Sequence, residues 1–287
     1  AQEKITLNVF NWGEYIDQDI FEEFEKQYPN IEINYETFDS NESMYTKLAT
    51  GDANYDVVIP SEYMIEKLIK ENRLLELDFD KIPNYANIDP DIIKKLNDEF
   101  SSTSRERIEI NKYAVPYFWG TVGILYDKTK VKEKVDSWDI LWDKDYKKEI
   151  FMYDSQRDSL MVSLKKLGYS MNTTSKKELE EAKDLLIEQK PLVYAYVTDT
   201  VIQGMIDSEA ALAVVYSGDA AYIMSENENM EFAIPKEGTN FWIDAMVIPK
   251  TSKNVDAAHK FINFMCDPEI ALRNTEHVMY SSPVKSV

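Results

Sequence analysis

Strand-like and helix-like patterns alternate near the start of the chain, and this order constrains the fold more than any other feature of the sequence. Apolar residues occupy every second position in 5–9 and 31–35, which is typical of strands. In 20–28 they recur at the spacing of a helix. A short buried strand is expected over 56–59, and Ser61 is expected to cap the helix that follows it. A β-α-β-α-β order of this kind predicts a parallel sheet with helices on both faces.

A second α/β alternation occupies the middle of the chain, after a polar loop over 101–111. Strands are expected over 122–126, 192–197 and 211–216, and helices over 158–167, 175–189, 199–206, 257–265 and 269–277. The chain is therefore expected to form an α/β protein with a parallel-type sheet in each of two lobes.

The segments 112–118 and 243–249 are typical of crossings between two such lobes. We expect 1–112 to form the first part of lobe 1, 113–244 to form lobe 2, and 245–287 to return to lobe 1. In α/β sheets, ligands bind at the carboxyl ends of strands. A hinged binding fold with its ligand at these strand ends is the architecture that the sequence predicts.

The chain is strongly acidic, and this balance limits its partners. Its 52 Asp and Glu residues against 32 Lys and Arg give a formal net charge of -20. Nucleic acid is disfavoured as a partner, because phosphate binding needs clustered basic residues. The 44% hydrophobic content allows a substantial core, and no apolar run reaches the roughly 18 residues of a membrane span.

Residues that bind metals or form disulfides are scarce. Cys266 is the one cysteine, so no disulfide within the chain is possible, and a buried thiol on a helix face is expected. His259 and His277 are too few and too far from a cysteine for a zinc site. No cofactor and no metal are therefore expected.

Aromatic residues stand beside isolated acids at several predicted strand ends. The motifs are Asn11–Tyr15, Tyr216–Asp219 and Phe241–Asp244, and Ser61–Tyr63 also follows a strand. Aromatic faces attract cations and carboxylates neutralise them, so a pocket built from both suits a small organic cation. Taken singly, each aromatic residue has an alternative role in core or rim packing. Trp138, by contrast, lies in a segment expected at the surface.

Three aspartates are candidates for binding such a cation. Asp244 lies within an apolar stretch, where a carboxylate is costly unless it is paired. Its alternative role is an Asp bonded to the backbone or to a distant Arg. Asp219 and Asp158 stand at predicted helix starts, where the alternative is a first-turn acid favoured by the helix dipole.

Catalysis is not required by anything in the sequence. Two carboxylates with aromatic residues also suit a glycosidase, which needs them about 5–10 Å apart. However, the abundance of acids makes any acid pair a weak signal. The sequence shows no Gly-rich phosphate loop, no Gly-x-Ser-x-Gly turn and no metal-ligand spacing.

The chain resembles bacterial spermidine/putrescine-binding proteins, the solute receptors of ABC importers. The likeness begins at Asn11–Tyr15 and runs in order along essentially the whole sequence. It continues through Phe38–Glu42, Tyr55–Ser61, Val115–Gly120, Leu167–Ser170, Pro235–Gly238 and Phe241–Asp244.

The resemblance implies a two-lobed type II periplasmic binding protein fold that closes on its ligand. It also implies binding residues, with Tyr216 standing where the family usually has Trp. The binding residues expected on these grounds are Trp12, Tyr15, Ser61, Tyr63, Asp158, Tyr216, Asp219, Trp242, Asp244 and Tyr280. Asp158, Asp219 and Asp244 would bind ammonium groups, while aromatic rings enclose the methylene chain.

The implied function is that of an extracytoplasmic receptor, not an enzyme. It would bind putrescine or spermidine in the inter-lobe cleft and, as a monomer, deliver it to the permease of an ABC importer. It would work in the periplasm, or at the cell surface as a lipoprotein whose leader is not part of this sequence. A sugar or amino-acid receptor of the same fold is the alternative, although neutral ligands would leave several carboxylates unpaired.

Three departures from the family pattern bear on selectivity and on the cleft. Ser155 replaces an acid of spermidine receptors, with Asp154 beside it, and Asp219 matches an acid of putrescine-selective relatives. We therefore expect putrescine to bind at least as well as spermidine. The family also continues beyond Ser281–Pro283 with further helices and a ligand-contacting Gln, whereas this sequence ends at Val287.

Overall fold

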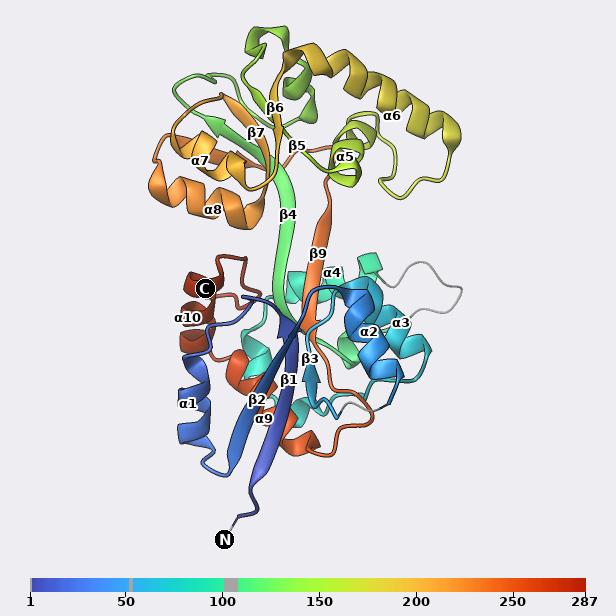
Figure 1. Cartoon of the computed structure of the whole chain (residues 1–287), viewed down its shortest axis with the longest axis vertical. Coiled ribbons are helices and arrows are strands. Elements are labelled where there is room, and N and C mark those ends of the chain that lie inside the picture. The colour runs from blue at the N-terminus through green and yellow to red at the C-terminus, as the bar shows by residue number, and fades with distance from the viewer. Residues whose placement is uncertain (1, 52–53, 101–107) are drawn as a thin grey trace. The chain divides into compact units, whose positions relative to one another are not determined.

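The computed structural model describes residues 2–51, 54–100 and 108–287. The chain divides into two compact units, which are taken here one at a time. Unit 1 comprises Ala1–Trp119 together with Trp242–Val287, and unit 2 comprises Gly120–Phe241 (Figure 1). The boundaries of these units lie at 119/120 and 241/242, whereas the sequence predicted lobe boundaries at 112/113 and 244/245.

The sheet of unit 1 has the strand order β2-β1-β3, and all its pairs are parallel, as predicted. Strand β1 (Ile5–Trp12) pairs with β2 (Ile31–Phe38) in a register that places Ile5 opposite Ile31. The short strand β3 (Val57–Val58) lies on the other side of β1. Trp12 and Phe38 consequently end neighbouring strands, and Ser61 follows the third strand at the same edge.

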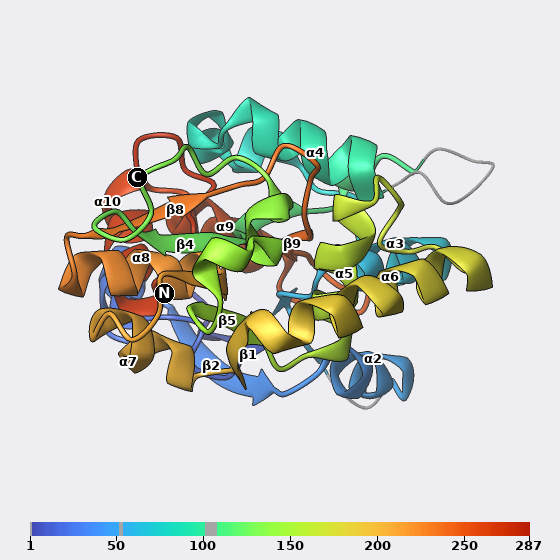
Figure 2. The ribbon, with the colours of Figure 1, turned by 90° about the horizontal axis from the view of Figure 1, so that it is seen from above.

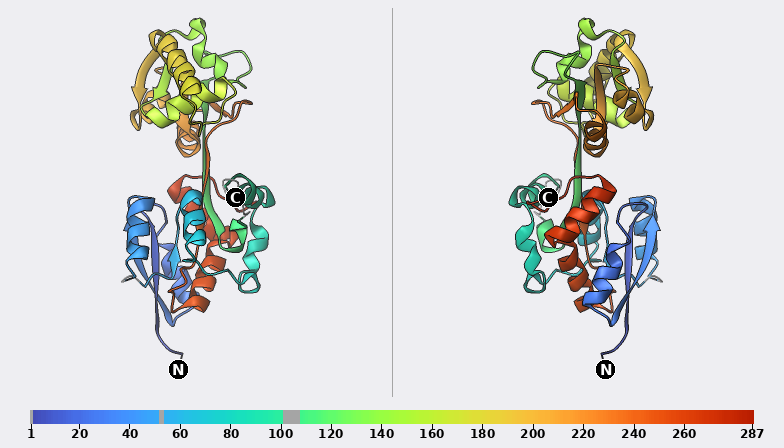
Figure 3. Two further views of the ribbon diagram at one scale, coloured as in Figure 1. Left: turned by 90° about the vertical axis from the view of Figure 1, so that its right-hand side faces the viewer. Right: turned by 90° about the vertical axis from the view of Figure 1, so that its left-hand side faces the viewer.

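Helices flank this sheet, and aromatic residues fill the space between them. In Figure 1, α1 and α10 lie to one side of the strands, and α2 and α3 lie to the other. The helices of unit 1 are α1 (Ile20–Gln27), α2 (Asn41–Ala49), α3 (Glu62–Lys70), α4 (Pro90–Phe100), α9 (Val255–Met265) and α10 (Pro268–Val278). Phe24 of α1 contacts Phe261 and Phe264 of α9 edge-on, at ring-centroid distances of 5.6 and 5.3 Å. Figure 3 shows the ribbon of this unit from two further sides.

The sheet of unit 2 is mixed, which corrects the prediction of a parallel-type sheet in each lobe. Its strand order is β6-β5-β7-β4-β8. Strands β5 (Ile150–Tyr153), β6 (Val193–Val197) and β7 (Leu212–Tyr216) are parallel, but β4 (Val115–Asp127) runs antiparallel to β7 and to β8 (Met230–Ala233). Apolar periodicity locates a strand but carries no information on its direction, so the sequence did not reveal this.

The helices of unit 2 begin within two residues of the predicted positions. They are α5 (Gln156–Lys166), α6 (Lys176–Gln189), α7 (Thr200–Ile206) and α8 (Ser217–Glu226). Helix α5 packs on α6, where the Ser163 hydroxyl donates to the Ala182 carbonyl at 2.7 Å, and α7 packs on α8 (Figure 2). Ser155 starts α5 as its N-cap, accepting a bond from the backbone N–H of Asp158.

Both crossings are strands. Strand β4 and strand β9 (Phe241–Met246) pair with each other, and each carries the chain across the boundary between the units. Gly123 of β4 is required where the backbone passes Phe232, because a Cβ there would lie 2.4 Å from the Phe232 ring. The long β4 thus merges the expected crossing at 112–118 with the expected strand at 122–126.

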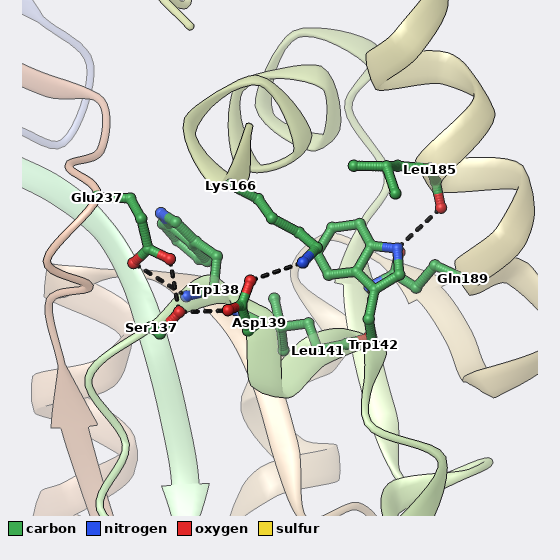
Figure 4. A network of polar contacts seen from close by, with 9 residues as sticks. All are labelled: Ser137, Trp138, Asp139, Leu141, Trp142, Lys166, Leu185, Gln189 and Glu237. Atoms are coloured by element: carbon green, nitrogen blue, oxygen red, sulfur yellow. Dashed lines mark hydrogen bonds and ion pairs between the residues drawn. The ribbon is translucent and has the colours of Figure 1, made fainter. Parts of the chain in front are cut away.

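Trp138 is fully buried in unit 2, so the prediction of a surface position for it was wrong. Its indole N–H donates to the Gly238 carbonyl at 2.8 Å, and Glu237 accepts bonds from Ser137 and from the Trp138 backbone (Figure 4). The acids around Trp138 suggested a solvated segment. In the structure, they lie at the ends of a short 3₁₀ helix whose apolar side faces inward.

Short 3₁₀ helices connect several of the elements. They are Phe79–Lys81, Pro83–Asn87, Ile110–Lys112, Trp138–Trp142, Lys144–Tyr146 and Lys190–Leu192. The polar loop expected over 101–111 lies largely outside the described residues, which resume at Ile108. Within the described parts of the chain, we find no helix that is both long and apolar enough to span a membrane.

Candidate functional site

Asp244 of β9 is the centre of the candidate site in unit 1. Its side chain is buried, with 6% of its surface exposed. The hydroxyl of Tyr15 donates to Oδ2 at 2.7 Å, and the hydroxyl of Ser61 donates to Oδ1 at 2.7 Å. Backbone pairing of Ser61 with Asp244 fixes the second contact. Residues from three distant parts of the sequence, all predicted to bind ligand, therefore meet at one carboxylate.

This carboxylate carries a charge that the surrounding protein does not balance. Within the described residues, no lysine or arginine forms an ion pair with Asp244. Desolvation raises the pKa of Asp244 from its ordinary 3.8 to about 6, although the hydrogen bonds from Tyr15 and Ser61 oppose the rise. The group is therefore ionised at neutral pH in an environment that disfavours its charge.

The turn after β1 holds Tyr15 in place through its backbone. The carbonyl of Tyr15 accepts a bond from the Tyr117 hydroxyl at 2.5 Å and a longer one from the Asn11 amide at 3.4 Å. Asn274 of α10 donates to the Tyr117 hydroxyl and accepts from the backbone N–H of Asp17. No supporting role was predicted for these residues, because buried amides and phenols have no periodicity of their own.

Ser61 occupies the N-cap position of α3, but its side chain forms no capping bond there. The prediction that Ser61 caps this helix was therefore wrong in its chemistry and right in its position. The hydroxyl instead donates to Asp244 and accepts from the Asn41 amide at 3.2 Å. Tyr63, two residues further on, is 51% exposed and donates to Glu42 at 3.0 Å.

Aromatic rings surround the Tyr15 side of the carboxylate. The Tyr15 ring contacts Tyr117, Phe118 and Tyr280 at centroid distances of 5.3, 5.4 and 5.5 Å. Of these three rings, the sequence analysis selected only Tyr280. Trp242 is half-buried two residues before Asp244 in β9, which places it on the same face of the strand.

Trp12 and Glu14 belong to the same turn as Tyr15. Trp12 packs against Phe38 at 4.7 Å, and its indole nitrogen is buried with no hydrogen-bond partner among the described residues. Glu14 is exposed and has a φ of 51°, a left-handed conformation that is uncommon for a residue other than glycine. The sequence analysis did not select Glu14, since backbone strain leaves no mark in composition.

Unit 2 contains a second carboxylate cluster. Asp158, in the first turn of α5, is 4% exposed and accepts a bond from the Tyr216 hydroxyl at 2.5 Å. The Tyr216 ring lies edge-on against Tyr153, at 4.9 Å. Two predicted binding residues thus meet at the carboxyl ends of β5 and β7. Both roles considered for Asp158 are compatible with this, because it stands in a first turn and is also bonded to an aromatic hydroxyl.

Asp219 lies in the first turn of α8 and is half-buried. Its pKa is raised, mainly by desolvation and secondarily by the negative charge of Asp199. Asp199 stands just before α7 and is exposed. The repulsion between the two acids favours a cation beside them. The sequence analysis missed Asp199, which follows a strand end without an adjacent aromatic residue.

Comparison with known proteins places the chain in a family. A model of the bacterial extracellular solute-binding protein family matches residues 19–287. The chain belongs to this family. A spermidine/putrescine-binding periplasmic protein of Salmonella typhimurium is 35% identical over 285 residues, which cover 99% of this chain and 79% of that protein. The putrescine-binding periplasmic protein SpuD of Pseudomonas aeruginosa is 33% identical, covering 98% and 78%.

Solved structures of the family agree with the two-lobed fold. The spermidine/putrescine ABC transporter substrate-binding protein PotD of Streptococcus pneumoniae, crystallised with calcium and HEPES, is 44% identical. It superposes with a TM-score of 0.82, covering 98% of this chain and 84% of that one. The expected type II binding-protein fold is thereby confirmed. These relatives bind solutes for transport and are not enzymes, which argues against the glycosidase interpretation.

Ionisation of Asp244 is expected to lower the free energy of unfolding. Asp244 titrates near 3.8 in the unfolded chain and at about 6 in the folded one. Between these values the folded state holds a proton that the unfolded state has lost, so this group's contribution to stability falls as pH rises from 3.8 to about 6. Asp244→Asn should therefore be more stable than the wild type at pH ~7.5, by up to roughly 3 kcal/mol, and similar to it near pH ~3.5.

Urea unfolding at the two pH values measures this difference, and Asp56→Asn is the matched control. Asp56 is also buried, but its carboxylate accepts bonds from the Asn8 backbone and the Ser252 hydroxyl, which an amide satisfies less well. The control should lose stability at both pH values. A loss of stability at pH ~7.5 for Asp244→Asn as well would show that the Asp244 charge supports the fold.

Proposed function

We propose that this chain is the extracytoplasmic polyamine receptor of an ABC importer, with Asp244 as an anchor for one ammonium group of putrescine or spermidine. The observation that carries the proposal is the buried carboxylate of Asp244, which has hydrogen-bond donors on both oxygens but no cation among the described residues. The printed names of several relatives, which bind spermidine or putrescine, support the same ligand class.

An ammonium group fits the electrostatics of this cluster. Each carboxylate oxygen has two acceptor sites, and the hydroxyls of Tyr15 and Ser61 use one on each oxygen. An ammonium brings the missing positive charge and further donors, and charge-assisted bonds of this kind are about twice as strong as neutral ones. The ring faces around Tyr15 add attraction for a cation and apolar surface for methylene groups.

The acids of unit 2 fit a ligand with more than one ammonium group. Asp158 and Asp219 also take part in no ion pair within the described chain. An amino acid would need a cation for its own carboxylate, and a neutral sugar would leave these charges uncompensated. A polyamine, which carries only positive charges along an apolar chain, meets both requirements.

The function requires binding and release, with no chemical step. Burial of the ligand ammonium beside Asp244 gains more from charge pairing than an exposed pair would, because the surroundings are poorly solvated. The name of the Streptococcus pneumoniae relative, an ABC transporter substrate-binding protein, supports delivery of the ligand to a membrane permease. A monomeric state and the identity of the permease stay predictions.

Polyamine binding should be visible as stabilisation and should depend on Asp244. At about 100 times the dissociation constant, putrescine or spermidine should raise the free energy of unfolding by about 2.7 kcal/mol. Asp244→Asn should weaken binding by about 2–5 kcal/mol, because an ammonium then loses its buried counter-charge. Isothermal titration calorimetry at pH ~7.5 measures the loss.

Glu22→Gln is the control for this experiment, since Glu22 is an exposed acid of α1 in the same unit. It should leave the affinity almost unchanged. Saturating putrescine and spermidine that leave the melting temperature unchanged, together with a rise caused by a sugar or an amino acid, would refute the polyamine assignment.

Selectivity between polyamines should depend on Asp219. A short diamine needs acids close together, so we predict that putrescine binds at least as tightly as spermidine. Asp219→Ser should shift the preference towards spermidine, and a tenfold change in the ratio corresponds to about 1.4 kcal/mol. Competition titrations decide the matter. A tenfold preference for spermidine in the wild type, unaltered by Asp219→Ser, would reject this role for Asp219 and leave the ligand class unaffected.

A further inference from the structure

Asn41, the first residue of α2, contacts Ser61 through both ends of its amide. The Ser61 backbone N–H donates to Asn41 Oδ1 at 3.0 Å, and Asn41 Nδ2 donates to the Ser61 hydroxyl at 3.2 Å. Asn41 is 5% exposed, and its hydrogen bonds within the described part of the chain go to Ser61 and not to Asp244. Resting on the function proposed above, we propose that Asn41 is a positioning residue that holds the Ser61 hydroxyl as a donor to Asp244 and thereby prepares the carboxylate for an ammonium ligand.

Only one assignment of donors and acceptors fits the contacts between Asn41, Ser61 and Asp244. A backbone N–H can only donate, so the atom of Asn41 that faces it must be the oxygen. The amide nitrogen therefore faces the Ser61 hydroxyl, which must act as its acceptor. The hydrogen of that hydroxyl is left for another partner, and Asp244 Oδ1 lies 2.7 Å away.

The alternative partner for Ser61 lies on its own helix. Ser61 has the backbone conformation of an N-cap, with φ −80° and ψ 159°, and serine at this position usually accepts a bond from the first helical turn. In α3 the Ser61 side chain does not form that bond. Without Asn41, the hydroxyl is free to rotate and cap the helix, so Asp244 would lose one of its two donors. Local rules of helix capping are typically broken at functional positions.

Other groups near Asp244 do not replace the Ser61 hydroxyl. Tyr15 already donates to the other oxygen, and Tyr117 and Tyr280 lie around its ring. Burial raises the pKa of Tyr15 and of Tyr117, so both phenols stay neutral below pH 10. Glu62 of α3 accepts a bond from the Ile243 backbone, and Glu42 of α2 accepts one from Tyr63.

The experiment first measures the ionisation of Asp244 without any ligand. Unfolding free energies from pH ~4 to ~8 are compared between each protein and the same protein carrying Asp244→Asn, so that the difference isolates the titration of Asp244. In the wild type the difference should level off near pH 6. With Asn41→Leu it should level off about one pH unit higher, because the charged form has lost a hydrogen bond. Asn41→Ala serves the same purpose if the leucine variant does not fold.

Two further variants separate positioning from general destabilisation. Ser61→Ala removes the donor itself and should give the same upward shift, and adding Asn41→Leu to it should cause no additional shift. Asn87→Leu is the control, because Asn87 is a half-buried amide of unit 1 that bonds the Cys266 carbonyl. It should leave the Asp244 titration unchanged. Equal titrations in wild type and Asn41→Leu, or shifts that add in the double variant, would overturn the proposal.

A ligand titration then connects this effect to binding. The pH midpoint of putrescine affinity should move upward by the same amount in Asn41→Leu. A rise of about one unit from a pKa of about 6 should weaken the affinity roughly fivefold at pH ~6 and about twofold at pH ~7, with nearly full recovery at pH ~8.5. Weakening of the same size at every pH would reject positioning through Asp244. Putrescine binding by the wild type tests the proposed function separately, because the ligand-free titration has an outcome even if putrescine does not bind.

Discussion

A buried carboxylate, with donors but no counter-ion among the described residues, is the constraint around which unit 1 is organised. Removing Asp244 from water costs free energy that two hydrogen bonds only partly offset, as its raised pKa of about 6 indicates. Most buried acids are either paired with a cation or neutral. An ionised acid that is left without a cation lowers stability, and in the function proposed above the ligand ammonium brings the missing charge.

The fold supplies the positions that this arrangement needs. Tyr15 and Ser61 follow parallel strands whose carboxyl ends lie at one edge, and β9 brings Asp244 to the same edge from the far end of the chain. A layer of supporting residues then fixes these side chains. Tyr117 and Asn274 hold the Tyr15 turn, and Asn41 holds Ser61. Each supporting residue lies on an element that also contributes to the core, so the site is built on rigid parts.

The sequence revealed the positions that periodicity and composition encode. The strands, the parallel pairing in unit 1 and the aromatic-acid motifs at the strand ends were predicted, and Tyr15, Ser61 and Asp244 do meet. The features that could not be predicted from the sequence depend on which groups compete for the same hydrogen-bond partner in the folded chain. Ser61 was predicted to cap α3, but its hydroxyl accepts from Asn41 and donates to Asp244, and no periodic pattern marks Asn41 for this role. Trp138 was predicted to lie at the surface because acids stand beside it in the sequence, but its indole faces inward and is buried.

The central question is whether the Asp244 carboxylate binds a ligand ammonium. A crystal structure of the protein grown with putrescine tests this most directly. We predict an ammonium nitrogen about 2.7–2.9 Å from an Asp244 oxygen, with the Tyr15 and Ser61 hydroxyls still donating to the same carboxylate. A bound putrescine whose nitrogens contact other groups, while Asp244 keeps only its two protein hydrogen bonds, would contradict the central claim.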